Sequence, residues 1–490
     1  MTLARRVIES GLWATAANAA ATFVILVRSI VLARLLPVEV FGVYAFAAAV
    51  VGLTAVAARF GLGGALLHRA DETRDESRAA TVHFTLTASF SMLWAAGLIA
   101  GASVFSEGDY LLALLVLTGA QIGTQLASTP RALLRRRITH RPLAWLRISG
   151  AVIGTAVALG LARAGHNLWA LLMIDVTAAA WSLIVLYLWR PVWRPRLSWD
   201  ARVVRYFLSF GARNLLGRLL EEALRRIDKL WIGVMMDQRA LGLYSRSDAY
   251  SRAPVEFLSR PFSSIASGAF AELKGNRLQL SRTVLRIAAV LFRGSCLFAT
   301  IVGLIAPELI LILIGDKWLP MIMSFRILLM AFVVDSVGKT FSQLLVAIGF
   351  PGLLVMIRVV QVAVLCTGIL AFGQFGLTGI AASVLASSLV GSVASIWSAR
   401  ASVDFSLWRL FAPPLLAAAL ALLTGISVQR LLPADLASWT AAAIPALAGT
   451  LVYVVLLLMM EARELKENFR LVLRHMKRAA PAANQEDIVA

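Results

Sequence analysis

Long apolar stretches, separated by short polar loops, recur along the whole of this 490-residue chain. A helix of about 20 residues, rising 1.5 Å per residue, crosses the roughly 30 Å of hydrocarbon in a bilayer. The stretches are too long for the strands of a membrane β-barrel, and they do not alternate between polar and apolar residues. The pattern therefore predicts an all-α, polytopic membrane protein with about 14 transmembrane helices. We place these helices at 11–33, 39–60, 80–102, 109–129, 143–163, 167–189, 206–235, 240–265, 284–306, 320–346, 353–372, 376–399, 408–429 and 438–460.

Basic residues in the loops predict how these helices are oriented. If the N-terminus is cytoplasmic, most loop arginines fall on the inside, and the outside loops hold only Arg34, Arg163, Arg239, Lys317 and Arg430. Short loops rich in Lys and Arg stay in the cytoplasm. We therefore expect both termini to be cytoplasmic, which requires an even number of spans.

The predicted spans divide into two halves and a terminal pair. The longest linker contains Pro191 and Pro195, and a Gly-x-Tyr turn occurs at Gly42 and again at Gly242, an offset of 200 residues. Parallel repeats of this kind are common in transporters. We expect a six-helix bundle at 1–190, a cytoplasmic linker at 191–205, a second six-helix bundle at 206–400, a helix pair at 401–460 and a cytoplasmic basic tail at 461–490, with a central cavity between the bundles.

Composition and charge narrow the function. The chain is 59% hydrophobic and 15% charged, with a net charge of +20. Because most of the positive charge lies in short loops between apolar spans, it favours contact with anionic membrane lipids over nucleic acid. The 2 cysteines and 5 histidines are scattered, and Val337–Thr340 lacks the leading glycine of a Walker motif. We therefore expect no metal, no cofactor, no direct use of ATP and no enzymatic activity.

A dense run of charge between Arg213 and Arg260 lies at predicted membrane depth. Each such charge costs roughly 2.5–3.5 kcal/mol on insertion scales, and intramembrane charges usually face a bundle interior or a water-filled pathway. On the span at 206–235, five polar residues recur at helical spacing and share one face: Asn214, Arg218, Glu221, Arg225 and Asp228. This face predicts a polar, mostly cationic cavity.

A second interpretation of the same charges is pairing inside the bundle. Arg218 is spaced to pair with Glu221 or Glu222, Arg225 or Arg226 with Glu222, and Lys229 with Asp228. The sequence leaves both interpretations open.

Three segments carry a resemblance to a known family: "ARLLPVEVFGVYAF" at 33–46, "RFGLGGALLHR" at 59–69 and "RIDKLWIGVMMDQRALGLYSRSDAY" at 226–250. With fourteen spans, the chain resembles the polysaccharide-transport (Wzx-like) branch of the multidrug/oligosaccharidyl-lipid/polysaccharide (MOP) exporter superfamily. The resemblance implies two bundles around a central cavity, alternating access, a bacterial inner membrane and a polyprenyl-diphosphate-linked oligosaccharide as cargo. It places the protein in exopolysaccharide, capsule or O-antigen biosynthesis, where polymerase or export machinery is a possible partner.

A diphosphate cargo needs cations, and arginine binds phosphate oxygens bidentately. The candidate substrate-binding residues are Arg28, Asn214, Arg218, Glu221, Arg225, Arg252, Lys339 and Arg358. For Arg28, a phosphate contact and a snorkelling anchor are both open.

Four further residues are candidates for ion coupling or gating: Asp175, Asp228, Lys229 and Asp335. Asp335 and Lys339 are four residues apart and are expected to pair. Asp175 is isolated, so both an ion site and a hydrogen-bonded structural carboxylate fit it.

The alternative function is a cation-coupled drug or metabolite efflux transporter of the same fold. Such a pump would favour buried carboxylates, especially in the first half, where the chain offers mainly Asp175. The excess of arginine at the candidate cavity favours an anionic cargo.

Overall fold

In the computed structural model of the chain, the described residues are 3–68, 76–137, 140–189, 191–433 and 438–479, and they contain helices and no strand. Each of the fourteen predicted spans corresponds to one long helix. These are α1 (Leu3–Leu35), α2 (Val38–Arg59), α4 (Glu76–Phe105), α5 (Gly108–Leu126), α7 (His140–Arg163), α8 (Asn167–Leu183), α9 (Ala201–Met235), α10 (Gln238–Glu272), α11 (Arg277–Leu304), α13 (Ile322–Ala347), α14 (Pro351–Phe372), α15 (Gly376–Ala399), α16 (Leu407–Leu431) and α17 (Ser438–Ala479). Shorter elements are α3 (Leu62–His68), α6 (Ser128–Arg136), η1 (Ile184–Trp189), α12 (Ala306–Leu313), η2 (Asp316–Met321) and η3 (Gly373–Phe375).

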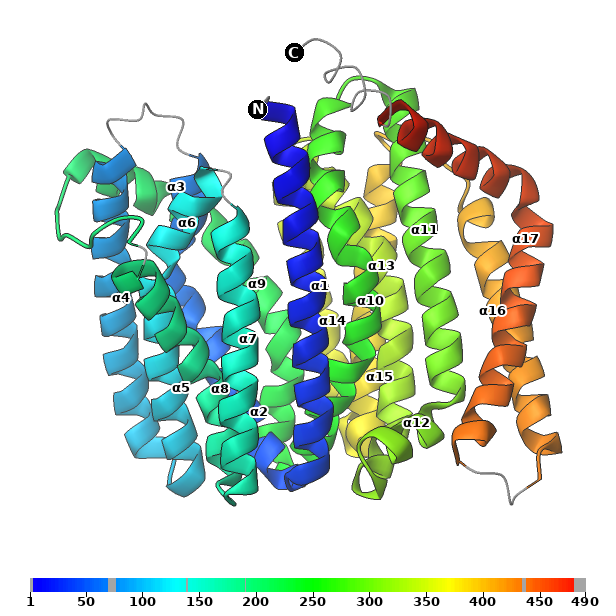
Figure 1. Cartoon of the computed structure of the whole chain (residues 1–490), viewed down its shortest axis with the longest axis horizontal. Helices are drawn as coiled ribbons and strands as arrows, with labels where there is room; N and C mark the ends of the chain where they lie inside the picture. The colour runs from blue at the N-terminus through cyan, green and yellow to red at the C-terminus, as the bar shows by residue number, and fades with distance from the viewer. Residues whose placement is uncertain (1–2, 69–75, 138–139, 190, 434–437, 480–490) are drawn as a thin grey trace, which may run out of the picture.

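Most of these helices have the length and hydropathy of membrane spans. Ten helical segments in the described part of the chain are long and apolar enough to cross a membrane, and one of them, Pro351–Ala399, contains both α14 and α15. The charged helices α9 and α10 are not among the ten, although they run between apolar helices (Figure 1). Some of their charged side chains, such as Asp228 and Asp248, are buried by neighbouring helices, whereas Arg218 and Arg225 of α9 are exposed.

Short polar residues start several of these helices. Asp200 accepts hydrogen bonds from the backbone N–H groups of Arg202 and Val203 at the start of α9, at 2.9 and 3.4 Å. Asp237 and Asn276 cap α10 and α11 in the same way. Such side chains satisfy the free N–H groups of a first helical turn. Because α9 begins at Ala201, its first turn occupies the end of the predicted 191–205 linker.

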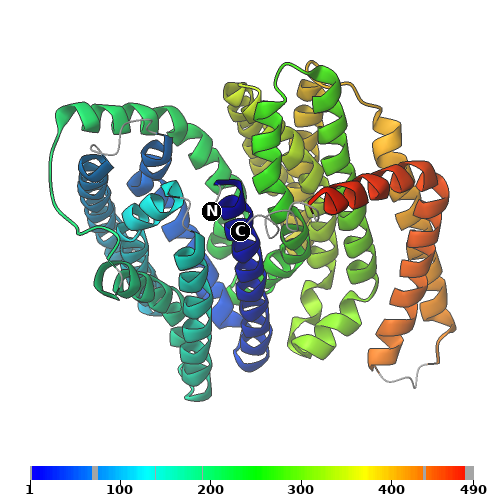
Figure 2. The ribbon, with the colours of Figure 1, turned by 45° about the horizontal axis from the view of Figure 1, so that its top comes forward.

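The helices form two groups joined by α1, α2 and α9 (Figure 1). Helices α4–α8 lie at one end of the molecule, α10, α11 and α13–α15 lie toward the other, and α16 and α17 form the outer flank. Figure 2 shows α9 leaning from the first group to the second. The first residue of α1 and the last of α17 lie on the same side, as an even number of spans requires. That this side is cytoplasmic stays a prediction.

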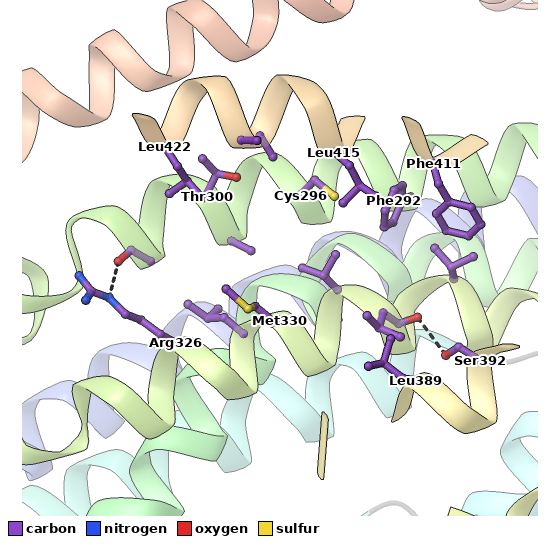
Figure 3. A pocket seen from close by; sticks show the side chains of 18 of the residues that line it. Phe292, Cys296, Thr300, Arg326, Met330, Leu389, Ser392, Phe411, Leu415 and Leu422 are labelled. Atoms are coloured by element: carbon purple, nitrogen blue, oxygen red, sulfur yellow. Dashed lines mark hydrogen bonds between the residues drawn. The ribbon is translucent and has the colours of Figure 1, made fainter. Parts of the chain in front are cut away.

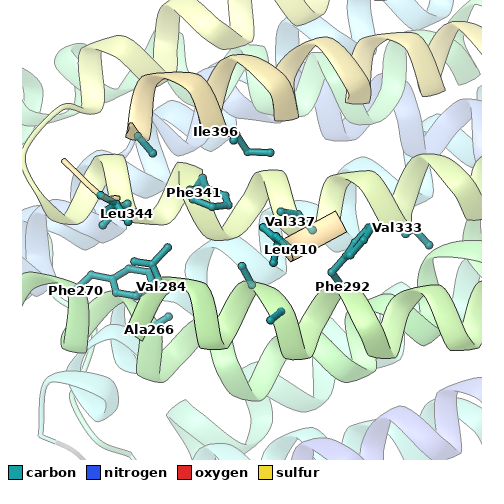
Figure 4. Packing of buried hydrophobic residues seen from close by; sticks show 14 of the residues in the cluster. Ala266, Phe270, Val284, Phe292, Val333, Val337, Phe341, Leu344, Ile396 and Leu410 are labelled. Carbon is teal, nitrogen blue, oxygen red and sulfur yellow. The ribbon is translucent and has the colours of Figure 1, made fainter. Parts of the chain in front are cut away.

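The largest apolar cluster among the described residues joins the second group to α16 and α17. Phe270, Val284 and Phe292 from α10 and α11 pack against Val337 and Phe341 of α13 (Figure 4). Large apolar side chains on the outside of the bundle are exposed, as expected where a helix faces hydrocarbon.

Helix α17 bends at Glu461, the residue at which the predicted tail begins. Glu461 has non-helical dihedral angles (φ −127°, ψ 19°), and the segment after it crosses the end of the bundle (Figures 1 and 2). The Glu461 carboxylate is buried and lies 2.6 Å from Nε of Arg293 in α11. This ion pair fixes the bend to the second group.

Candidate functional site

A buried charge cluster joins α9 to α10. The Asp248 carboxylate accepts from Nζ of Lys229 at 2.6 Å and from Nη2 of Arg252 at 2.7 Å. The Tyr244 hydroxyl donates to Asp228 at 2.8 Å. Asp228 and Asp248 are 3% and 6% exposed, so the cluster is shielded from solvent.

The predicted pairing of Lys229 with Asp228 is wrong. Neighbouring residues on a helix point about 100° apart, so the two side chains diverge, and Asp228 accepts from the backbone N–H of Lys229 and from Tyr244. Lys229 instead pairs with Asp248, a residue that was not among the predicted site residues. Its position four residues before Arg252 was the available signal.

A polar cavity of about 530 Å³ opens between α9, α10, α13, α14 and α15. Six of the predicted residues line it: Glu221, Arg225, Arg252, Asp335, Lys339 and Arg358. Four cations therefore meet two carboxylates on the cavity wall, which gives the lining an excess of positive charge.

Ion pairs hold several of these side chains in place. Arg358 contacts Glu221 at 3.2 Å and donates to the Gly217 carbonyl at 2.9 Å. The predicted Lys339–Asp335 pair is present at 2.7 Å. Arg225 has a looser contact, 3.9 Å to Glu221, and its side chain is 45% exposed. Of the four lining cations, Arg225 is thus the least committed to a protein partner.

The remaining polar lining consists of hydroxyl and amide groups: Ser342, Gln343, Gln361, Ser387, Ser388, Ser392 and Ser395. The Ser342 and Ser395 hydroxyls lie 3.0 Å apart. Hydroxyls and amides both donate and accept hydrogen bonds, so this wall suits a hydroxyl-rich group. The lining as a whole fits a ligand that is anionic at one part and polyhydroxylated at another.

Asn214 and Arg218 do not line this cavity. They lie beside α3 and the turn that joins it to α2: the Asn214 Cβ is 3.8 Å from an ideal Cβ on Gly61, and Nη2 of Arg218 is 3.5 Å from one on Gly64. The predicted polar face of α9 therefore meets two environments. Its helical spacing was correctly recognised, but α9 leans between the two helix groups, so one face has different partners along its length (Figure 2).

Arg28 and Asp175 belong to a second charged cluster. Tyr44 donates to Asp175 at 2.7 Å, and Arg28 is close enough to both to interact electrostatically. Arg246 of α10 also interacts with Arg28 and donates to the Ser29 hydroxyl at 3.3 Å. Two arginines from separate halves thus approach each other here. The predicted grouping of Arg28 with the cavity cations is not what the structure shows.

An apolar cavity of about 980 Å³ lies between α11, α13, α15 and α16. Phe292, Cys296, Met330, Leu389 and Leu415 line it, and Arg326 lies at one end, donating to the Gly303 carbonyl at 2.8 Å (Figure 3). A continuous apolar run in the sequence cannot distinguish the wall of a cavity from a helix surface that faces lipid, so this cavity was missed.

Within the described residues, no group of three or more His, Cys, Asp or Glu side chains is placed to hold a metal ion.

The chain is similar in sequence to known proteins of polysaccharide synthesis. A family model described as "Polysaccharide biosynthesis protein" matches residues 31–323. Over 142 residues the chain is 28% identical to the teichuronic acid biosynthesis protein TuaB of Bacillus subtilis (strain 168), and this match spans 29% of each chain. Over 364 residues it is 21% identical to the lipopolysaccharide biosynthesis protein WzxC of Escherichia coli (strain K12), spanning 71% of each chain.

The fold is similar to that of solved transporters. The lipid II flippase MurJ, in an inward closed conformation, has a TM-score of 0.76 at 11% identity and covers 93% of this chain and 100% of its own. An inward-facing multidrug resistance MATE family transporter of the MOP superfamily has a TM-score of 0.60 at 16% identity, covering 78% and 94%. The predicted family resemblance is confirmed in sequence by the family model and by WzxC, and the protein is a multi-pass inner-membrane protein with the fold of these solved transporters.

The family model spans well over half of the chain, including the linker and the charged helices α9 and α10. The two sequence relatives are named as biosynthesis proteins of teichuronic acid and lipopolysaccharide. The chain belongs to the Polysaccharide biosynthesis protein family.

Proposed function

We propose that the protein moves a polyprenyl-diphosphate-linked oligosaccharide repeat unit from the cytoplasmic to the periplasmic leaflet, by alternating access. The translocated repeat unit would serve exopolysaccharide, capsule or O-antigen synthesis. The observation that carries this proposal is the 530 Å³ cavity, whose wall combines excess positive charge with serine hydroxyls and glutamine amides.

The cations suit the diphosphate. Arginine stays charged at any physiological pH, and its planar fork matches two phosphate oxygens. Arg225 is 45% exposed and weakly paired, so it can contact phosphate without breaking a short ion pair. Arg252 already binds Asp248 at 2.7 Å, so it attracts the diphosphate through its positive charge without contacting it directly.

The apolar cavity suits the rest of such a cargo. Its wall is almost entirely aliphatic, aromatic and thioether, which is the environment that a hydrocarbon chain prefers. A lipid-linked saccharide needs a polar and an apolar site in one protein; the polar cavity lies in the second half, and the apolar cavity lies between that half and α16. Two similar proteins support a lipid-linked cargo: the name of WzxC, a relative in sequence, refers to lipopolysaccharide, and the name of MurJ, which is similar in fold, refers to lipid II.

A drug efflux function is less well supported. A site for cationic drugs needs available carboxylates, but three candidate acids already have partners. Glu221 is paired with Arg358 and Asp335 with Lys339, and Asp175 accepts a hydrogen bond from Tyr44.

A deletion strain tests the proposed function. We expect one polyprenyl-diphosphate oligosaccharide to accumulate on the cytoplasmic leaflet of the inner membrane, together with loss of a surface polymer. Mass spectrometry of the extracted glycolipid would then give the sugar sequence. Unchanged glycolipid and polymer, with altered sensitivity to drugs or metabolites, would replace this proposal with efflux.

A further inference from the structure

Helix α2 of the first half contacts α9 of the second half along most of its length. The contacts occur at four levels: Phe60 with Gly211, Arg59 with Glu222, Ala48 and Gly52 with Arg226, and Phe46 with Gly233. We call this contact the α2–α9 seam. If the two halves rock apart on one side, this seam must open on that side.

Arg226 crosses the seam and binds the backbone of α2. Its Nη1 donates to the Ala48 carbonyl at 2.6 Å, and its Nε contacts Glu222 of its own helix at 2.8 Å. The guanidinium lies flat over Gly52, where an ideal Cβ would be 2.0 Å from Cζ of Arg226. Only glycine at position 52 therefore lets this side chain reach the first half.

The charges around Arg226 do not balance. Arg59 lies 3.6 Å from Glu222 and interacts electrostatically with Arg226 and Arg218. Arg59 and Arg226 thus share the Glu222 carboxylate, and Arg218 adds a third positive charge beside Arg59. Nε of Arg59 is buried and has no hydrogen-bond partner among the described residues. In the closed seam, the Ala48 carbonyl partly compensates for the excess positive charge.

Opening the seam removes that carbonyl from Arg226. Arg226 would then lose a partner within the membrane span while Arg59 and Arg218 remain nearby, which is costly without an added anion. A diphosphate carries at least two negative charges and several acceptor oxygens, and arginine binds such groups bidentately. An anion that binds the open seam but not the closed one shifts the equilibrium toward opening.

We propose that Arg226 is a latch between the two halves and that a diphosphate group releases it, with Arg59 and Arg218 receiving the anion as the seam opens. The inference rests on the proposed function for the identity of the anion. It makes Arg226 a positioning residue that links cargo arrival to movement of the halves.

Distance measurements between spin labels on the two helices test the latch. Ala57 of α2 and Leu216 of α9 are exposed and lie outside the latch contacts, so cysteines there can be labelled after Cys296 and Cys366 are replaced by alanine. The purified full chain in nanodiscs is measured alone, with farnesyl diphosphate, with inorganic pyrophosphate and with farnesol. We expect one short distance alone and with farnesol, and an added longer distance with each of the two diphosphates.

Gly52→Ala and Gly97→Ala form a matched pair. Both replace a glycine inside a helix, with a similar gain of roughly 1 kcal/mol in helix propensity, but a Cβ at Gly97 meets nothing within 4 Å. Gly52→Ala should displace the guanidinium and show the longer distance without ligand. Gly97→Ala should match the parent. Arg226→Met, which removes the cation without adding volume at position 52, should also show the longer distance and lose its response to pyrophosphate.

Two results would overturn the latch. One is an unchanged short distance in both Gly52→Ala and Arg226→Met. The other is a seam that does not respond to either diphosphate while the parent protein still transports a lipid-linked saccharide. A seam that opens with pyrophosphate in a protein that moves no lipid-linked saccharide would instead keep the latch and remove the proposed cargo.

Discussion

The buried cluster between α9 and α10 gives a quantitative prediction. Asp248 is 6% exposed and serves two cations, Lys229 at 2.6 Å and Arg252 at 2.7 Å. Asp248→Asn keeps the shape of the side chain and removes its charge. The two cations then lose their shared carboxylate inside the bundle, and breaking a buried pair in this way costs about 3–5 kcal/mol.

A second substitution should restore part of that loss. Lys229→Met alone leaves the Asp248–Arg252 pair intact. In the double variant, one cation has been removed together with the carboxylate, and Arg252 remains in the electrostatic field of Asp228. We therefore expect the double variant to be more stable than Asp248→Asn alone, with a coupling energy of roughly 0.5–3 kcal/mol.

Thermal unfolding of the purified variants, followed by tryptophan fluorescence at a fixed scan rate, measures this order. The expected ranking is parent, then Lys229→Met, then the double variant, with Asp248→Asn least stable. Strictly additive losses in the double variant would refute the reasoning, because they would show that Lys229 and Asp248 do not stabilise one another.

Three further predictions follow from single contacts. Gly42→Val should destabilise the protein and lower its abundance in the membrane, because a Cβ at Gly42 would lie 1.9 Å from the rigid backbone oxygen of Gln238; normal abundance and melting would contradict this contact. Lys317→Ala should lower the melting temperature, because its ammonium group caps carbonyls at the end of α1 at 2.7 and 3.1 Å; an unchanged melting temperature would show that this cap contributes nothing. The hydrogen bond from Arg277 lowers the pKa of Asp404, which lies in a loop outside the helices. The stability that this interaction adds to the folded protein is therefore fully present above the unfolded pKa of about 3.9, and it is lost as the pH falls through the folded pKa. Asp404→Asn should therefore melt below the parent at pH 7 and converge with it in acid, and a constant difference would argue against this linkage.

The fold could be predicted closely from the sequence because hydrophobic length is a strong signal in membranes. Every predicted span corresponds to one long helix, including the two spans at 206–235 and 240–265 that carry the dense run of charge. The helix ends were less accurate. The cap at Asp200 starts α9 inside the predicted linker, because a capping side chain sets the boundary independently of the apolar pattern.

The site could be predicted only in part. Spacing along one helix identified Glu221 and Arg225, and the structure places both on the cavity wall. Spacing could not show that Asn214 and Arg218 meet α2 and α3, because that depends on the lean of α9. Contacts between distant segments, such as Arg226 with the Ala48 carbonyl, leave no pattern in a single sequence.

Transport by the reconstituted protein tests the central claim most directly, namely that the cavity in the second half receives an anionic saccharide headgroup. The assay follows a fluorescent polyprenyl-diphosphate oligosaccharide from one leaflet of a proteoliposome to the other, with equal amounts of parent, Arg225→Ala and Arg282→Ala. Arg282 is an exposed arginine of α11 that does not line the cavity, so it controls for loss of one surface charge. We predict that Arg225→Ala lowers the rate at least tenfold, corresponding to about 1.4 kcal/mol of lost stabilisation, and that Arg282→Ala leaves the rate unchanged. Equal rates in all three proteins would contradict the assignment of this cavity.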